Sequence, residues 1–265
     1  MNKKFEALQT ANTITNAILC DLKSFILREK VLSTKEVEIR TDRLIKLMSI
    51  ENKLEPAFKG YKGFPSSICI SLNDEVVHGI PTEDKFIKKG DLVSLDLGIR
   101  YKGYCSDMAI SFVNSKFSFG KKQKLVEATK RALEEAIKNI QQTYPLCHLS
   151  TIVAAIYKYS TKYGIVDSYG GHEIGEQIHQ GKLFVANSWS NFKNDAIIPV
   201  GTAFTIEPMF TLGKGDVKVD KDGWTVRTID GSSAAHFEYS LFITDKGIEI
   251  LKWEEKIKKE KKYLQ

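Results

Sequence analysis

Two aspartates fall where a predicted β-hairpin would bring them together. Residues 92–100 alternate between large aliphatic side chains and small or acidic ones, which predicts a strand with Asp96 on the less bulky face. After a turn near Lys102-Gly103, a second strand to Phe112 would carry Asp107 roughly opposite Asp96. Two facing carboxylates repel each other unless protons or a cation lie between them. Asp is uncommon in strands, so a metal site and an edge strand with two solvated acids are equal alternatives.

Three further residues could complete such a site. Glu207 shares a face with Thr205 in a strand predicted over 203–208, and Glu238 lies at mid-strand in 235–243. His172 follows Gly170-Gly171 in a chain with five histidines, and glycine allows close approach of the backbone to a ligand. A surface glutamate or a structural histidine is the commoner interpretation of each residue taken alone.

Four carboxylates and one imidazole together fit a dinuclear metal site. Bridging carboxylates can hold two divalent ions about 3.5–4 Å apart, and such a pair binds and activates a water as nucleophile. Oxygen-rich ligation favours Mn(II), Fe(II) or Co(II), with zinc as an alternative. The chemistry expected is therefore metal-dependent hydrolysis.

The elements that must position these residues alternate between helical and extended segments. Apolar residues recur at helical spacing from Ile14 to Ile26, and Ser33 with Glu36 predicts a capping box that opens a second helix. Strands begin near Ser67, helices follow at about 121–142 and 149–163, and 164–251 is again rich in strands. We predict an α+β fold in a single catalytic domain, 1–265, in which 251–265 is a basic C-terminal tail; two similar halves are an alternative description of the same domain.

Composition and charge exclude few classes of protein. Hydrophobic residues make up 42% and charged residues 27% of the 265, which is ordinary for a globular domain. Six lysines and three glutamates after Leu251 supply half of the net charge of +6. Such a tail can contact a ribosome or nucleic acid but is more often a solvated helix, and the remaining charge is too small to indicate a nucleic-acid enzyme.

The four cysteines form no Cys-x-x-Cys pair, which argues against a thiolate zinc site. Without an apolar run long enough to span a membrane, we expect a cytoplasmic protein.

The ordered motifs of the chain resemble those of the type I methionine aminopeptidases of the short bacterial kind. The resemblance runs from about Ile14 to Leu251. Its motifs are Tyr61-Lys62-Gly63-Phe64-Pro65, the run from Asn73 to Pro81, Gly90 to Val93 with Asp96, Asp107, Gly171-His172, Ile174-Gly175, His179, Thr205 to Met209, Gly223 to Val226, and Phe237-Glu238.

The resemblance implies a fold and a set of roles. The fold is the "pita-bread" arrangement, with two pseudo-symmetric halves whose helices lie outside a curved antiparallel sheet. Asp96 would bind one metal ion, His172 and Glu207 the other, and Asp107 and Glu238 would bridge the two. The resemblance also implies contacts with the substrate: His78 and His179 with the scissile peptide, and Tyr61, Phe64, Cys69, Ile178 and Trp224 with the methionine side chain. Aromatic rings and a thiol make a soft apolar slot for a thioether.

The implied activity is removal of the initiator methionine from nascent chains whose second residue is small, by a monomeric enzyme. The chain departs from the family pattern at Glu173, at Cys105-Ser106, at His236 and Tyr239 on either side of Phe237-Glu238, and at Gln180-Gly181-Lys182-Leu183. One alternative is an Xaa-Pro peptidase of the same fold, which usually has an extra N-terminal domain and lacks the motif around Trp224. Another is a non-catalytic binding protein, which usually loses metal ligands; all five are present here.

Overall fold

The computed structural model describes residues 3–49, 53–115 and 120–251. The basic helix expected after Leu251 lies outside these residues. Within them, no helix is long and apolar enough to cross a membrane.

The N-terminal half places two helices beside short antiparallel sheets. Helices α1 (Lys3–Arg28) and α2 (Thr34–Met48) come first, and the capping box of Ser33 and Glu36 opens α2 as predicted. A central sheet has the order β3 (Cys69–Leu72), β6 (Leu92–Leu97), β9 (Met108–Val113). The smaller strands are β1 (Leu32–Ser33) with β5 (Phe86–Ile87), and β2 (Glu55–Pro56) with β7 (Ile99–Tyr101) and β8 (Tyr104–Cys105). A 3₁₀ turn, η1 (Tyr61–Gly63), precedes β3.

The C-terminal half repeats this plan. Helices α3 (Lys121–Thr143) and α4 (Leu149–Tyr157) precede a five-stranded sheet of order β12 (Gln180–Val185), β11 (Gly171–Glu173), β13 (Ala203–Ile206), β18 (Tyr239–Ile243), β19 (Ile248–Leu251). A second sheet joins β10 (Gly164–Ile165), β14 (Met209–Thr211) and β17 (Ala234–His236). The 3₁₀ turn η2 (Trp189–Asn191) lies between β12 and β13.

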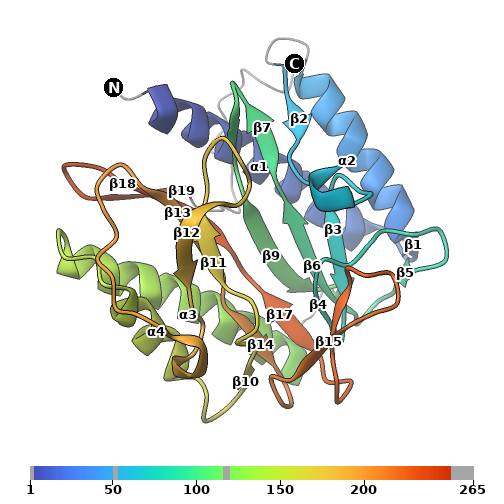
Figure 1. Ribbon diagram of the computed structural model, residues 1–265. Coiled ribbons are helices and arrows are strands. Elements are labelled where there is room, and N and C mark those ends of the chain that lie inside the picture. Colours follow the sequence, from blue (N-terminus) through green and yellow to red (C-terminus); the bar gives the residue numbers. More distant parts are fainter. Residues whose placement is uncertain (1–2, 50–52, 116–119, 252–265) are drawn as a thin grey trace.

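Backbone pairing joins the two halves at their centre. Strand β4 (Glu75–Val77) of the first half pairs with β16 (Val226–Thr228) of the second, which also pairs with β15 (Val217–Val219). Ala109 and Glu238 exchange two backbone hydrogen bonds, of 3.0 and 3.3 Å. In Figure 1 the strands of both halves lie side by side through the centre of the molecule, with α1 and α2 flanking those of the N-terminal half and α3 and α4 flanking those of the C-terminal half. The α+β prediction is confirmed.

Local details differ from the sequence-based expectations. The strand predicted over 92–100 is interrupted at Gly98, where the Phe58 ring and the Ser106 carbonyl oxygen approach so closely that a Cβ would lie 2.7 and 2.9 Å from them. Asp96 pairs with Ala109 and Leu97 with Met108, so Asp107 lies just outside the ladder.

Two other expectations also need correction. Glu238 is not at mid-strand but in the break between β17 and β18, where it forms the bridge to Ala109. The helix expected to reach Tyr163 ends at Tyr157, because the chain turns and packs Tyr159 and Tyr163 against the Phe210 ring.

Candidate metal centre and active site

The five predicted metal ligands converge on the seam between the two halves. Asp96 lies within β6 and His172 within β11. The other three occupy gaps between strands: Asp107 between β8 and β9, Glu207 between β13 and β14, and Glu238 between β17 and β18. At such interruptions the side chains leave the regular alternation of a strand, so Asp107 of the N-terminal half and the two glutamates of the C-terminal half reach one point.

The imidazole of His172 is central to this group. Its Nε2 lies 3.6 Å from an oxygen of Asp107, 3.7 Å from one of Glu207 and 3.9 Å from one of Glu238. These separations are too long for good hydrogen bonds. Two atoms that each lie about 2.1 Å from one ion are roughly 3 to 3.5 Å apart, so a modest contraction would close this shell around a cation. His172 Nε2 and single oxygens of Asp107 and Glu238 all lie within 4.8 Å of one another.

The carboxylates are buried with oxygens that lack partners. Asp96 is 9% exposed, Asp107 4% and Glu238 2%. Asp96 Oδ1, Asp107 Oδ1 and Glu238 Oε1 accept no hydrogen bond within the described part of the chain. Buried charges of this kind are costly unless they are paired or coordinate a metal. The donor set therefore fits a site for divalent cations.

Burial and the charges of neighbouring groups shift the pKa values of these acids. Burial, followed by the charge of Asp107, raises the pKa of Asp96 well above its usual range. Burial and the same neighbour raise the pKa of Glu238. Burial also acts to raise the pKa of Glu207, but the adjacent imidazoles of His236 and His172 outweigh it and lower this pKa. The protein places negative charge where only bound cations or protons can neutralise it.

Hydrogen bonds orient His172 and Glu207. The backbone N–H of His172 donates to Thr205 Oγ1 at 3.0 Å, and the Thr205 hydroxyl donates to Glu207 Oε1 at 3.3 Å. His172 Nδ1 lies 3.2 Å from the carbonyl oxygen of Glu173, so it can carry the proton while Nε2 faces the acids. The predicted shared face of Thr205 and Glu207 is confirmed by their contact.

Two more histidines lie beside this cluster, as the motifs led us to expect. His78 follows β4 with a φ of 59°, and its ring centroid is 5.6 Å from that of Tyr169. His179 is exposed, but its ring centroid lies 3.8 Å from that of His172 and 5.3 Å from that of Tyr61. Loss of hydration, with repulsion from neighbouring imidazoles, lowers the pKa of both His78 and His179 to about 4. Both are therefore neutral near pH 7 and can each offer one N–H as a donor.

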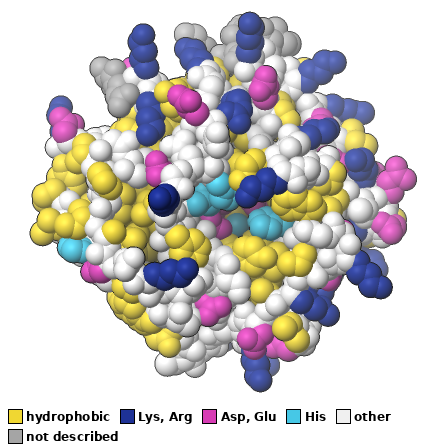
Figure 2. All heavy atoms as spheres, in the orientation of Figure 1, with side chains coloured by type: hydrophobic (Ala, Val, Ile, Leu, Met, Phe, Trp, Pro, Cys, Tyr) yellow, Lys and Arg dark blue, Asp and Glu magenta, His cyan; other side chains and the backbone are white. Residues whose placement is uncertain are grey.

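An apolar cluster adjoins the histidines. All five residues expected to line the methionine pocket belong to it, namely Tyr61, Phe64, Cys69, Ile178 and Trp224. Phe64 and Trp224 meet edge to face with centroids 5.1 Å apart. In Figure 2, histidine side chains gather in a hollow at the centre of the face, flanked by hydrophobic side chains and with acidic atoms in its floor.

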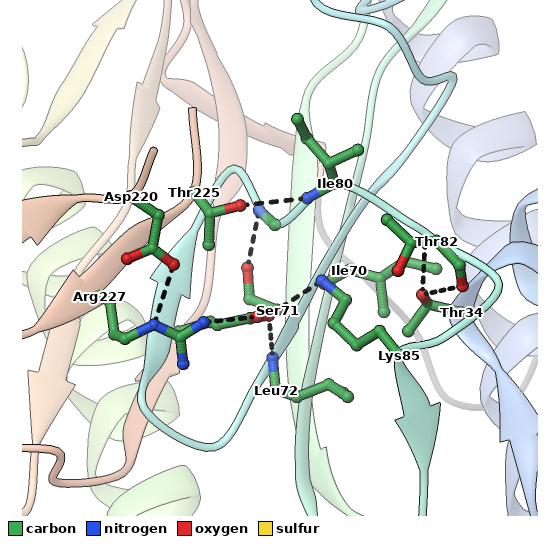
Figure 3. Close-up of polar contacts among 12 residues, drawn as sticks. Thr34, Ile70, Ser71, Leu72, Ile80, Thr82, Lys85, Asp220, Thr225 and Arg227 are labelled. Atoms are coloured by element: carbon green, nitrogen blue, oxygen red, sulfur yellow. Dashed lines mark hydrogen bonds and ion pairs between the residues drawn. The ribbon is translucent and has the colours of Figure 1, made fainter. Parts of the chain in front are cut away.

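A polar network ties together the segments that carry His78 and Trp224. The N–H of Ile80 donates to Thr225 Oγ1 at 3.4 Å, and Arg227 donates to Asp220 at 3.0 Å (Figure 3). Behind them Glu75, in β4, accepts hydrogen bonds from Arg227 and Lys85, both at 3.1 Å. Strand β4, which His78 follows, is thus anchored to β16, which follows Trp224.

The departures noted in the sequence are placed differently from one another. The Glu173 carboxylate accepts a hydrogen bond from Gln180 at 3.1 Å on the neighbouring strand β12 and belongs to neither cluster of candidate ligands. Ser106 contacts Thr15 of α1 at 2.6 Å between their hydroxyl oxygens. Cys105 and Tyr239 are buried.

His236 is a site residue that our sequence reasoning did not assign. It lies beside Glu207 and Glu238, and the ligand atoms of the three are within 4.8 Å of one another. Its spacing of two residues from Glu238 was the available signal, since such residues share a face when a strand is regular.

Comparison with known proteins agrees with this geometry. Residues 6–245 match the model of metallopeptidase family M24. A methionine aminopeptidase of Aquifex aeolicus is 44% identical over 206 residues, covering 74% of this chain and 78% of the relative. Methionine aminopeptidase 1 of Bacillus subtilis is 38% identical over 222 residues, covering 83% and 85%.

Solved structures show the same relationship. The methionine aminopeptidase of Thermotoga maritima superposes with a TM-score of 0.86 at 32% identity, covering 96% of this chain and 98% of that one. The prolidase of Pyrococcus furiosus has a TM-score of 0.66 at 22% identity, and the match covers only 64% of its chain, so this likeness concerns the fold. The predicted pita-bread fold is thereby confirmed, and the chain belongs to metallopeptidase family M24, among its methionine aminopeptidases.

Proposed function

We propose that this protein removes the N-terminal methionine from nascent proteins and peptides whose second residue is small, as a cytoplasmic monomer. The observation that carries the proposal is the convergence of a cation-binding cluster, two neutral histidines and an apolar aromatic slot at one seam of the fold. Contact of the basic tail 251–265 with the ribosome stays a prediction.

In this proposal Asp96 would hold one divalent ion, His172 and Glu207 would hold a second, and Asp107 and Glu238 would contribute to both. The ions are Co(II), Mn(II), Fe(II) or Zn(II). When bound, they supply Lewis acidity and lower the pKa of a water that acts as nucleophile.

The side chains around the ions bind and orient the substrate. The methionine side chain enters the slot between Phe64, Trp224 and Cys69, where a thioether meets aromatic rings and a thiol. His78 and His179 are neutral, so each can donate an N–H to the scissile peptide as charge develops on it. Their places on the two sides of the seam put one donor in each half of the protein.

A peptide assay tests the proposal. The purified full chain, supplied with Mn(II) or Co(II), is incubated with Met-Ala-Ser and, separately, with Ala-Pro. Release of free methionine from the first peptide alone is expected. Cleavage of Ala-Pro instead would indicate an Xaa-Pro peptidase. Inactivity on both peptides with every divalent ion would indicate a binding protein on this scaffold.

A further inference from the structure

His236 is a buried imidazole that the five expected ligands do not include. It is 2% exposed at the end of β17. Neither ring nitrogen has a hydrogen-bond partner in the described part of the protein. A buried polar group without a partner is unfavourable, so the position of this ring requires a physical explanation.

The backbone holds this ring in place without using its nitrogens. The N–H of His236 donates to Ser111 Oγ at 2.9 Å, and the Ser111 hydroxyl contacts the His236 carbonyl oxygen at 2.8 Å. Ser111 in turn lies 2.6 Å, oxygen to oxygen, from the hydroxyl of Ser94 in β6. The residue is thus anchored to the central sheet of the other half, while both ring nitrogens stay available.

The His236 ring faces the cluster of candidate metal ligands. Its Nε2 lies 3.6 Å from Glu207 Oε2, while the other oxygen of this carboxylate, Oε1, lies 3.7 Å from His172 Nε2. Glu207 therefore sits between two imidazoles. Its separation from His236 is too long for a good hydrogen bond and is close to the spacing of two donors on a shared ion, roughly 3 to 3.5 Å.

We propose that His236 is an additional metal ligand, whose Nε2 joins Glu207 and Glu238 on the same ion. This inference rests on the metal centre of the proposed function and deepens it. A second imidazole in a set otherwise dominated by carboxylates favours Zn(II), Fe(II) and Co(II) over Mn(II). His236 would thus give this chain a metal preference that the five expected ligands alone would not produce.

Spectroscopy of the cobalt form tests ligation directly. In the Co(II)-loaded full chain, proton NMR should show two strongly shifted, solvent-exchangeable imidazole N–H signals, one from His172 and one from His236. The variant His236→Gln should retain one. The matched control His148→Gln, which removes an imidazole paired with Asp195 away from the cluster, should retain both. A single signal in the unaltered protein, or two in His236→Gln, would overturn the assignment, and the first result needs no variant to fold.

Metal affinity gives an independent measurement. In competition with a chromophoric chelator, His236→Gln should weaken binding of Co(II) to the affected ion site by about 100-fold and of Mn(II) by about 10-fold or less. Equal losses for both ions would instead indicate that His236 only orients Glu207. These titrations contain no peptide. A protein that binds metal as inferred but releases no methionine would therefore contradict the proposed function alone.

Discussion

The strand that carries His78 into the site depends on a buried ionic contact, and Glu75→Gln tests it. The Glu75 side chain is 6% exposed and accepts from Lys85, Arg227 and the backbone N–H of Leu72, the last at 2.8 Å. Glutamine keeps the size of the side chain but removes its charge and turns one oxygen into a donor. At least one of the two cations then faces an N–H group.

The expected loss of stability follows from how deeply the contact is buried. Removing one partner of a buried ion pair costs about 3–5 kcal/mol. Lys85 and Arg227 are themselves 19% and 29% exposed, and Arg227 keeps its contacts with Asp74 and Asp220. We therefore take the lower end, about 3 kcal/mol, which corresponds to a fall in melting temperature of roughly 6–12 °C for a protein of this size.

Asp74→Asn is the matched control, because Asp74 contacts the same Arg227 at 2.7 Å but is 26% exposed. Its loss should stay below about 1 kcal/mol. Both variants are measured by thermal and urea denaturation at a fixed metal concentration, and kcat for methionine release is measured well below the melting temperature. Glu75→Gln should also lower kcat, since His78 directly follows β4. Equal stability of the two variants, or a Glu75→Gln protein within about 1 kcal/mol of the unaltered one, would refute the reasoning.

Three other predictions concern the site itself. His179→Ala should leave metal content unchanged but lower kcat by about 10²–10⁴-fold; loss of metal, measured by elemental analysis, would mean that His179 is a ligand. Glu173→Gly should leave kcat/KM for a Met-Ala peptide within a few-fold of the unaltered value, because the carboxylate bonds to strand β12; a large loss would show that it has a part in the site. The raised pKa values of Asp96 and Glu238 keep protons on the folded, metal-free protein that the unfolded chain has released, so its stability falls as pH rises through the folded pKa values. The gain in melting temperature on adding Mn(II) should then be larger at about pH 8 than at about pH 6.5, because protons compete with the cation for these carboxylates, while folded His78, with a pKa of about 4, stays neutral at both values; a gain that shrinks with pH would count against this cluster as the metal site.

Features that depend on residues close together in the chain were predictable from sequence. The capping box of Ser33 and Glu36 is made within one helical turn, so its geometry follows from spacing alone. Strand alternation likewise predicted that Asp96 lies on the less bulky face of its strand and that Thr205 and Glu207 share a face of theirs. Both predictions depend only on spacing within one strand. The resemblance supplied the remaining residues as a set, although their individual roles stay predictions.

The tertiary structure decided what depends on contacts between distant segments. Alternation cannot reveal that the strand is interrupted at Gly98, where Phe58 and Ser106 lie too close to leave room for a side chain. The position of Glu238 arises likewise from its bridge to Ala109 of the other half.

The direction of His236 depends on the same kind of long-range contact. Ser111, 125 residues earlier in the chain, anchors its backbone, and Glu207, which lies between β13 and β14, faces its ring. Side-chain types and local periodicity therefore determined which residues could ligate a metal. The meeting of the two halves at one seam determined which of these side chains face one another, because only there do segments far apart in sequence exclude water from the same few atoms.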